Sequence, residues 1–328
     1  MEGRFLFLTI MDKCYIGIDL GGTRVKVGLV SGGRVIARGM VSPGAGLAET
    51  LPVLRDAINA LLAGIPLSGG SGGEALAGVG LAFAGLADPV AKRILSTNKK
   101  YDDARDVDLA AWVASEWGCV FFIDNDARMA AVGEWKYGAG RGVDDLVAMT
   151  IGTGIGTSVI MGGRLLRGRH FQAGCLGGHF SVQYNGRVCT CGNQGCMEAY
   201  GATWGLDERI RDDAGFAGSL LGGAGDGSIG FLEVFEAADK GDVLALRVLD
   251  ECRDVWAAGI VNMIHAYDPE VVVIGGGVMA RATDILPYVT ERVHAHAWTP
   301  WGRVELRASE LLEDAGILGV VYCLEHGV

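Results

Sequence analysis

One short stretch of the chain has the residue types and spacing of a metal site. Cys189, Cys191 and Cys196 lie within eight residues, and His179 precedes them by ten positions. Three thiolates and one imidazole form a tetrahedral donor set that structural zinc sites use. The set leaves no coordination position open, so it predicts a structural Zn²⁺ rather than a catalytic one. A cysteine cluster that holds no metal is the alternative.

A second group of polar residues could move a proton. Asp124, Asn125 and Asp126 follow the apolar segment 121–123 and precede a segment with helical spacing. A carboxylate at such a junction can accept the proton of a substrate hydroxyl. Plain helix capping is the alternative, because Asn and Asp are favoured at helix N-termini. The residues by themselves leave both interpretations open.

Three glycine-rich turns could bind a nucleotide, because glycine lets successive backbone amides approach a phosphate closely. Neither of the first two turns carries the lysine of a P-loop, and neither is clearly followed by the helix of a Rossmann site. Ordinary hairpins, or a common strand-to-helix turn for the third, are the alternatives. The residues concerned are Asp19, Gly21, Gly22 and Thr23 in the first turn, Gly152, Thr153, Gly154 and Gly156 in the second, and Gly275, Gly276 and Gly277 in the third. In the first turn, the Asp19 carboxylate could hold Mg²⁺.

The elements that position these residues repeat along the chain. Strands are predicted around the first turn and again around the second, and Ser31-Gly32-Gly33-Arg34 corresponds to Met161-Gly162-Gly163-Arg164 at an offset of 130 residues. An internal repeat predicts two copies of one supersecondary unit, and two unrelated hairpins are the alternative. Apolar spacing predicts further strands at 76–83, 120–123 and 271–274 and helices at 49–63, 108–117, 127–137, 242–266 and 315–324.

Length and composition limit the remaining choices. The 328 residues suit two domains, and 53 glycines in a chain that is 50% hydrophobic predict tight turns rather than disorder. A net charge of −11 argues against a nucleic-acid partner. The sequence has no apolar run near the roughly 20 residues of a membrane helix, and residues 1–10 do not read as a signal peptide. We therefore expect a cytoplasmic protein without a membrane partner, and leave open whether residues 1–10 are native structure.

Taken together, the motifs resemble the ROK family within the sugar kinase, Hsp70 and actin superfamily. The turn at Asp19 is similar to the first phosphate motif, 152–156 to the second, and 268–277 to the adenosine motif, while the cysteine cluster resembles the family's zinc signature. The resemblance covers nearly the whole chain. It implies an α/β fold of two actin-like (ribonuclease H-like) domains with a central cleft. The expected N-terminal domain spans 13–135 with a helix at about 312–326 packing back on it, and the expected C-terminal domain spans 136–311 and carries the zinc knuckle.

The resemblance implies an ATP-dependent kinase of the glucokinase type that phosphorylates a hexose or hexose-like sugar at its 6-hydroxyl. Asp126 would be the catalytic base, Asp19 would anchor Mg²⁺, and the three turns would hold ATP. The expected sugar-binding residues are Asn98, Asn125, His179 and Glu198. A small-molecule sugar is the expected partner. Relatives commonly form dimers, so the resemblance also implies that a homodimer is possible, although the sequence shows no interface.

One residue departs from the family pattern. Leu176 stands three residues before His179, where the family usually has a Glu that binds sugar, so the identity of the sugar stays open. An N-acetylhexosamine or fructose kinase and a non-catalytic sugar sensor are alternatives. The sugar-responsive repressors of the family carry an N-terminal DNA-binding module, for which the fourteen residues before the first strand are too few. A scaffold ATPase of the actin or Hsp70 type is disfavoured by the zinc cluster and by Asn125 and Asp126.

Overall fold

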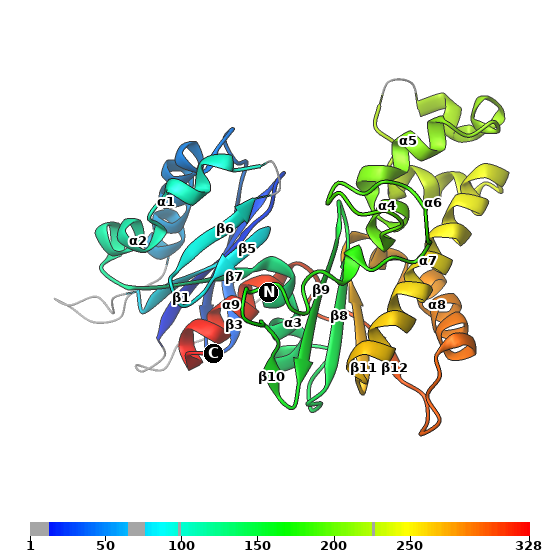
Figure 1. The fold of residues 1–328 in the computed structure, drawn as a ribbon. Coiled ribbons are helices and arrows are strands. Elements are labelled where there is room, and N and C mark those ends of the chain that lie inside the picture. The colour runs from blue at the N-terminus through cyan, green and yellow to red at the C-terminus, as the bar shows by residue number, and fades with distance from the viewer. Residues whose placement is uncertain (1–12, 65–75, 98–99, 225–226) are drawn as a thin grey trace, which may run out of the picture. The chain divides into compact units, whose positions relative to one another are not determined.

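The computed structural model describes residues 13–64, 76–97, 100–224 and 227–328, which divide into two compact units (Figure 1). Unit 1 consists of the described part of Met1–Gly138 together with Glu313–Val328. Unit 2 consists of the described part of Ala139–Leu312. Each unit is built around one five-stranded sheet.

The sheet of unit 1 has the strand order β3-β2-β1-β4-β7. Strands β1, β4 and β7 run parallel, while β2 and β3 are antiparallel to their neighbours. Its strands are β1 (Cys14–Leu20), β2 (Val25–Ser31), β3 (Arg34–Val41), β4 (Gly78–Phe83) and β7 (Val120–Asn125), and β5 (Gly85–Asp88) pairs separately with β6 (Arg93–Thr97). The helices are α1 (Leu47–Ala63), α2 (Leu109–Trp117), α3 (Asp126–Tyr137) and α9 (Ala315–His326).

The two faces of this sheet differ because side chains alternate along each strand. One face supplies aliphatic residues of β1, β2 and β4 to a core shared with α1 and α2. The other face carries Gly17 and Gly28, which pair across β1 and β2. A Cβ at Gly17 or Gly28 would lie 2.7 or 2.6 Å from Ile317 of α9. Helix α9 can therefore lie directly on the sheet, next to the end of β1.

Unit 2 repeats the same sheet with the order β10-β9-β8-β11-β12. Strands β8, β11 and β12 are parallel, and β9 and β10 complete an antiparallel meander. The strands are β8 (Leu146–Ile151), β9 (Ile155–Met161), β10 (Arg164–Leu165), β11 (Val271–Gly275) and β12 (Glu305–Ala308). The helices are α4 (Met197–Gly201), α5 (Leu206–Arg211), α6 (Phe231–Asp239), α7 (Val243–Tyr267) and α8 (Ala282–His296).

The turn between β2 and β3 in unit 1 and the turn between β9 and β10 in unit 2 confirm that the two units contain copies of one supersecondary motif. Gly32 and Gly33 have φ angles of 54° and 71°, and Gly162 and Gly163 have 54° and 68°. A two-residue hairpin turn of type I′ requires positive φ at both central positions, which glycine adopts without strain. The paired glycines at the 130-residue offset therefore encode the same turn twice.

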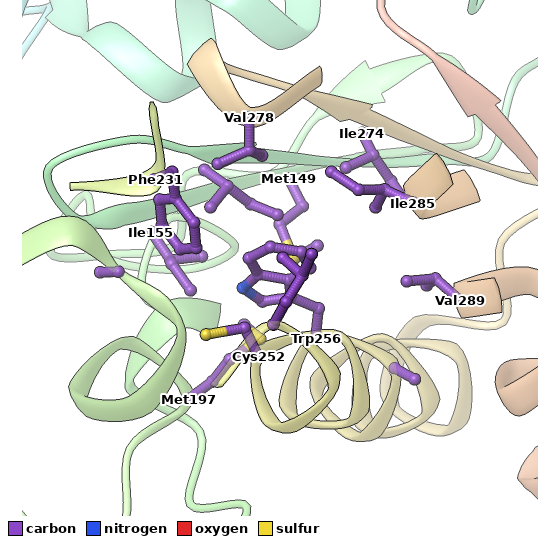
Figure 2. Packing of buried hydrophobic residues seen from close by; sticks show 14 of the residues in the cluster. Met149, Ile155, Met197, Phe231, Cys252, Trp256, Ile274, Val278, Ile285 and Val289 are labelled. Atoms are coloured by element: carbon purple, nitrogen blue, oxygen red, sulfur yellow. The ribbon is translucent and has the colours of Figure 1, made fainter. Parts of the chain in front are cut away.

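Trp256 of α7 organises the core of unit 2. Figure 2 shows its indole ring beneath Met149 of β8 and beside Phe231 of α6, and the two ring centroids lie 5.6 Å apart. The indole Nε1 donates to the carbonyl oxygen of Gly201 at 2.9 Å, so this buried polar group is satisfied. The same bond fixes the short helix α4 against α7. Of the helices within the described ranges, none is long and apolar enough to cross a membrane.

Candidate active site and metal site

The carboxyl ends of the parallel strands gather three of the predicted site residues of unit 1. Asp19 on β1 is in register with Ala82 on β4, which is in register with Asp124 on β7. Because neighbouring strands lie about 4.8 Å apart, the backbones of Asp19 and Asp124 are separated by about 10 Å. Asn125 ends β7 and Asp126 begins α3. Asp19, Asn125 and Asp126 therefore share one edge of the sheet.

Asp126 keeps one carboxylate oxygen available. Its Oδ1 accepts from the backbone N–H of Ala127 at 2.8 Å and from Nδ2 of Asn125 at 2.9 Å. Oδ2 makes no hydrogen bond to any residue that the structure describes. Burial, and after it the charge of Asp19, raises the pKa of Asp126 to about 7, although the two hydrogen bonds act in the opposite direction. Such a carboxyl group can take up and release a proton near neutral pH.

Asn125 is the N-cap of α3, so the capping interpretation of this segment holds for it. Its Oδ1 accepts from the backbone N–H of Arg128 at 3.1 Å, and its Nδ2 also donates to the carbonyl oxygen of Gly85 at 3.0 Å. Asp124, which precedes Asn125 in the chain, forms a fully buried ion pair with Arg128. Nη1 of Arg128 is 3.1 Å from Oδ1 of Asp124. The pair was not anticipated from sequence. Its buried contacts fix the backbone that carries Asp126.

The first glycine turn is held by a residue that the sequence analysis missed. The hydroxyl of Tyr101, a buried side chain, donates to the carbonyl oxygen of Gly21 at 2.9 Å. Burial raises the pKa of this hydroxyl to about 12, so it remains a donor at neutral pH. Gly22 and Thr23 are exposed beside it. Asn98, the other predicted sugar-binding residue of unit 1, lies outside the described residues.

The second and third glycine turns lie at neighbouring strand ends of unit 2. Strands β8 and β11 are parallel, and Gly275 is in register with Thr150. Gly276 has a φ of 95°, and a side chain there would collide with the carbonyl oxygen of Ile151. The second turn, residues 152–154, follows Ile151 directly and leads into β9, which contains Gly156. Both turns thus lie at the same edge of the sheet, where α/β folds bind ligands.

Glu198 is held against the second turn. Its Oε2 accepts from the backbone N–H of Ile155 at 2.8 Å, and its Oε1 accepts from the indole Nε1 of Trp204 at 3.3 Å. The backbone N–H of Trp204 in turn donates to the carbonyl oxygen of Thr153 at 3.1 Å. Each carboxylate oxygen retains a lone pair for a further donor. Trp204 is a second contact that residue spacing could not reveal.

The four predicted metal ligands converge in unit 2. One ligand atom from each of His179, Cys189, Cys191 and Cys196 lies within 4.8 Å of all the others. Nδ1 of His179 is 3.6 Å from Sγ of Cys189, and the sulfurs of Cys191 and Cys196 are 3.7 Å apart. A tetrahedral zinc ion separates two thiolate sulfurs by about 3.8 Å and a sulfur from an imidazole nitrogen by about 3.6 Å. The donor set and its spacing therefore fit a single zinc ion.

Glycines give the cysteine loop its shape. Gly192 and Gly195 have φ angles of 90° and 73°, and a side chain at Gly195 would collide with the carbonyl oxygen of Gln183. The segment at His179 is bonded to the start of α4, because Phe180 accepts from the backbone N–H of Met197 at 2.9 Å. An ion at this site would therefore tie the His179 segment to the helix that carries Glu198.

Comparison with known proteins identifies extensive similarity. The family model described as "ROK family" matches residues 15–326. A glucokinase from Thermotoga maritima is 33% identical, with 95% of this chain and 98% of that protein covered. A xylose repressor from Bacillus subtilis is 26% identical over 75% of this chain, but only 60% of the repressor is covered.

Solved structures agree with this result. A ROK family glucokinase from Streptomyces griseus, crystallised in complex with glucose and AMPPNP, superposes with a TM-score of 0.75. The two proteins are 29% identical, and the match covers 94% of this chain and 97% of the other. The two-domain, actin-like α/β fold that the motifs predicted is thereby confirmed.

Proposed function

The chain belongs to the ROK family, and on that basis we propose that it is an ATP-dependent kinase that phosphorylates a hexose at the 6-hydroxyl. Asp126 carries this proposal. Its carboxylate has an available Oδ2 and a pKa raised to about 7, and it shares a sheet edge with Asp19. These are the properties that a general base for a sugar hydroxyl requires. The similarity to glucokinases supports the same reaction class.

The proposed reaction is a direct transfer. The 6-hydroxyl oxygen of the sugar attacks the γ-phosphorus of ATP, and the bond from that phosphorus to the oxygen bridging the β-phosphate breaks. Oδ2 of Asp126 accepts the hydroxyl proton, so the products are ADP and a sugar 6-phosphate. Catalysis then depends mainly on positioning and on the stabilisation of negative charge. Mg²⁺ held by Asp19 would neutralise part of the phosphate charge.

The three glycine turns have separate roles in the proposal. The glycine-rich turns at 21–23 in unit 1 and 152–156 in unit 2 would hold phosphate oxygens, because both lie at strand ends. In the second turn the donors would be the amides of Thr153 and Gly154, since the N–H groups of Gly152 and Ile155 already donate to Gly154 and Glu198. Gly275, Gly276 and Gly277 would leave room for the adenosine. Tyr101 would keep the first turn in its binding conformation through its bond to Gly21.

We further propose that one structural Zn²⁺ orders the sugar-binding segment. With Nδ1 of His179 on the metal, its Nε2 stays available to a sugar hydroxyl. Glu198 of unit 2 would accept from a second hydroxyl through a remaining lone pair. Asn98 and Asn125 of unit 1 are the other residues that we propose bind sugar hydroxyls. Asn125 can do so only by sharing atoms that already cap α3 and bind Gly85.

Two observations support alternatives within the same family. Similarity to a xylose repressor favours a protein that binds sugar without phosphorylating it, although Asp126 has no evident purpose in such a protein. Leu176 is 38% exposed and offers no hydrogen-bonding group, which favours a sugar other than glucose, such as an N-acetylhexosamine or fructose. The homodimer that the family resemblance implies stays a prediction.

A sugar panel separates these functions. Purified protein is incubated with MgATP and glucose, mannose, fructose, N-acetylglucosamine or N-acetylmannosamine, and ADP release is followed while sugar binding is measured by calorimetry. A kinase releases ADP only with a sugar that it binds. A sensor binds a sugar without ADP release, and a scaffold ATPase releases ADP at the same rate with or without sugar.

A further inference from the structure

A half-buried tryptophan connects two parts of unit 2 to which the proposed function gives different ligands. Trp204 follows the short helix α4, on which Glu198 lies. Its indole Nε1 donates to Oε1 of Glu198 at 3.3 Å, and its backbone N–H donates to the carbonyl oxygen of Thr153 at 3.1 Å. Glu198 is a proposed sugar ligand, and Thr153 belongs to a turn proposed to bind phosphate. One residue therefore contacts both proposed sites.

The backbone bonds of residues 203 and 204 determine where the second turn can donate. The N–H of Thr203 donates to the carbonyl oxygen of Gly152 at 3.0 Å, as that of Trp204 does to Thr153. In a planar trans peptide the C=O and the N–H point in opposite directions. The N–H groups of Thr153 and Gly154, the proposed phosphate donors, therefore point away from residues 203 and 204. The bonds to the two carbonyl oxygens also polarise these peptides, which makes their N–H groups stronger donors.

The side chain of Glu198 closes a ring of contacts around the turn. Its Oε2 accepts from the backbone N–H of Ile155 at 2.8 Å, directly after the proposed donor Gly154. Its Oε1 is connected through Trp204 to Thr153. Thr153 and Gly154 thus lie between two contacts that both end on one carboxylate. A ligand that fixes this carboxylate also restricts the turn.

The packing of the indole ring is separate from its hydrogen bond. The ring of Trp204 packs against a small cluster formed by Cys189, Cys196 and Ala199, and against the core of unit 2. A phenylalanine would keep apolar contacts of this kind, but its ring has no N–H group to donate. The link to Glu198 can therefore be removed while most of the packing remains.

We propose that Trp204 is a positioning residue that couples the two ligands, so that a sugar held by Glu198 raises the affinity of the second turn for the nucleotide. The inference rests on the proposed function, because it takes the sugar and the nucleotide from it. A glutamate side chain and a glycine turn both lose much conformational freedom when they become ordered. Once the sugar has fixed Glu198, the nucleotide binds to a turn that is already restricted. Because coupling between two ligands is reciprocal, a bound nucleotide raises the affinity for the sugar by the same factor.

A purely structural role of Trp204 predicts a different result. If the ring only supports the fold, its replacement weakens the binding of each ligand whether or not the other is present. The ratio of nucleotide affinities with and without sugar then stays the same. A coupling residue changes this ratio, while each ligand alone binds almost normally. Contacts elsewhere in the chain that link the two ligands are present in wild type and variant alike, so a change in the ratio belongs to Trp204.

The test measures this ratio. Calorimetry on the wild type and Trp204→Phe gives the affinity for AMPPNP with Mg²⁺, a non-hydrolysable ATP analogue, with and without a saturating sugar. The sugar is the member of the panel that the wild type binds most tightly. We expect the sugar to strengthen nucleotide binding by at least about fivefold in the wild type and by less than about twofold in Trp204→Phe. Each ligand alone should bind the variant within about threefold of the wild type, since one hydrogen bond is lost and the fold is kept. Trp298→Phe, which changes an indole of unit 2 that is 79% exposed, is the matched control and should keep the wild-type ratio.

Hydrogen exchange on the wild type gives a second readout that needs no variant, and it decides the question if Trp204→Phe does not fold. Sugar alone, without nucleotide, should slow the exchange of the Ile155 amide, which donates to Glu198. The same ratio in wild type and Trp204→Phe, or no effect of sugar on Ile155, overturns the coupling role while leaving the kinase intact. A wild type that binds sugar but no nucleotide, or that releases no ADP with any sugar, overturns the proposed function itself.

Discussion

The substitution Asp126→Asn should stabilise the protein at alkaline pH while removing its activity. It keeps the shape of the side chain and the oxygen that accepts from Ala127. The pKa of Asp126 is raised to about 7 in the folded protein, mainly by burial. A carboxyl group with a raised pKa favours folding below its unfolded pKa of about 3.9, and this stability is lost as pH rises to about 7. The neutral Asn carries no such penalty.

The size of the effect follows from the shift. About three pKa units correspond to an upper limit of about 4 kcal/mol at 1.36 kcal/mol per unit. Asp126 retains some exposure, and screening by solvent reduces the expected gain to about 1–2 kcal/mol. For a unit of this size the thermal midpoint then rises by about 2–8 °C at pH values above 7. The gain should grow from about pH 4 to pH 7 and stay constant above that.

The assay is thermal unfolding without nucleotide, Mg²⁺ or sugar at a series of pH values, together with the rate of ADP release. Turnover of Asp126→Asn should fall by about 10²- to 10⁴-fold, as for the loss of a general base. The exposed Asp106 supplies a control, since Asp106→Asn should change neither quantity. An Asp126→Asn variant that is no more stable than wild type above pH 7 would refute the electrostatic reasoning. Near-normal turnover would show that another group is the base.

Three further predictions concern the metal, the first turn and the sugar. Metal analysis of protein purified without chelators should find one zinc per chain, and Cys191→Ser should lower both the thermal midpoint and the affinity for sugar; protein without zinc would contradict this. Tyr101→Phe should raise the KM for ATP several-fold, with about 1 kcal/mol lost from the bond to Gly21, and leave the KM for sugar unchanged; an equal rise in both would indicate a general loss of structure. Leu176→Glu should increase the preference for glucose over the best wild-type sugar by about 10- to 100-fold, because it supplies an acceptor to a hydroxyl that otherwise lacks one; if glucose is already the best substrate and the variant does not improve it, Leu176 is only a wall of the pocket.

The sequence analysis correctly predicted the turns and helices whose formation depends on residues close together in the chain. Paired glycines identified the turns at Gly32 and Gly162, which the φ angles show to be of type I′. Apolar spacing placed α7 and α9 to within two residues of their ends. Helix α8, which contains Pro287, was not predicted from the sequence. Its stability comes from packing, with Ile285, Val289 and Val293 buried in the core of unit 2.

The candidate site was accessible to sequence analysis wherever ligands are close in the chain. Cys189, Cys191 and Cys196 fall within one loop, so their spacing alone indicated metal. The contact of Glu198 with Ile155 bridges 43 positions, and that of Tyr101 with Gly21 bridges 80. Such pairs are set by strand order and helix packing, which become known only with the fold.

The central claim, that Asp126 promotes phosphoryl transfer from ATP to a sugar hydroxyl, is tested most directly by identifying the product. Wild-type protein and Asp126→Asn are incubated with MgATP and the sugar that supports ADP release, and the reaction is followed by phosphorus NMR. The account predicts ADP and a sugar 6-phosphate in equal amounts from the wild type and almost none from the variant. Inorganic phosphate in place of a sugar phosphate, or equal product from both proteins, would contradict it.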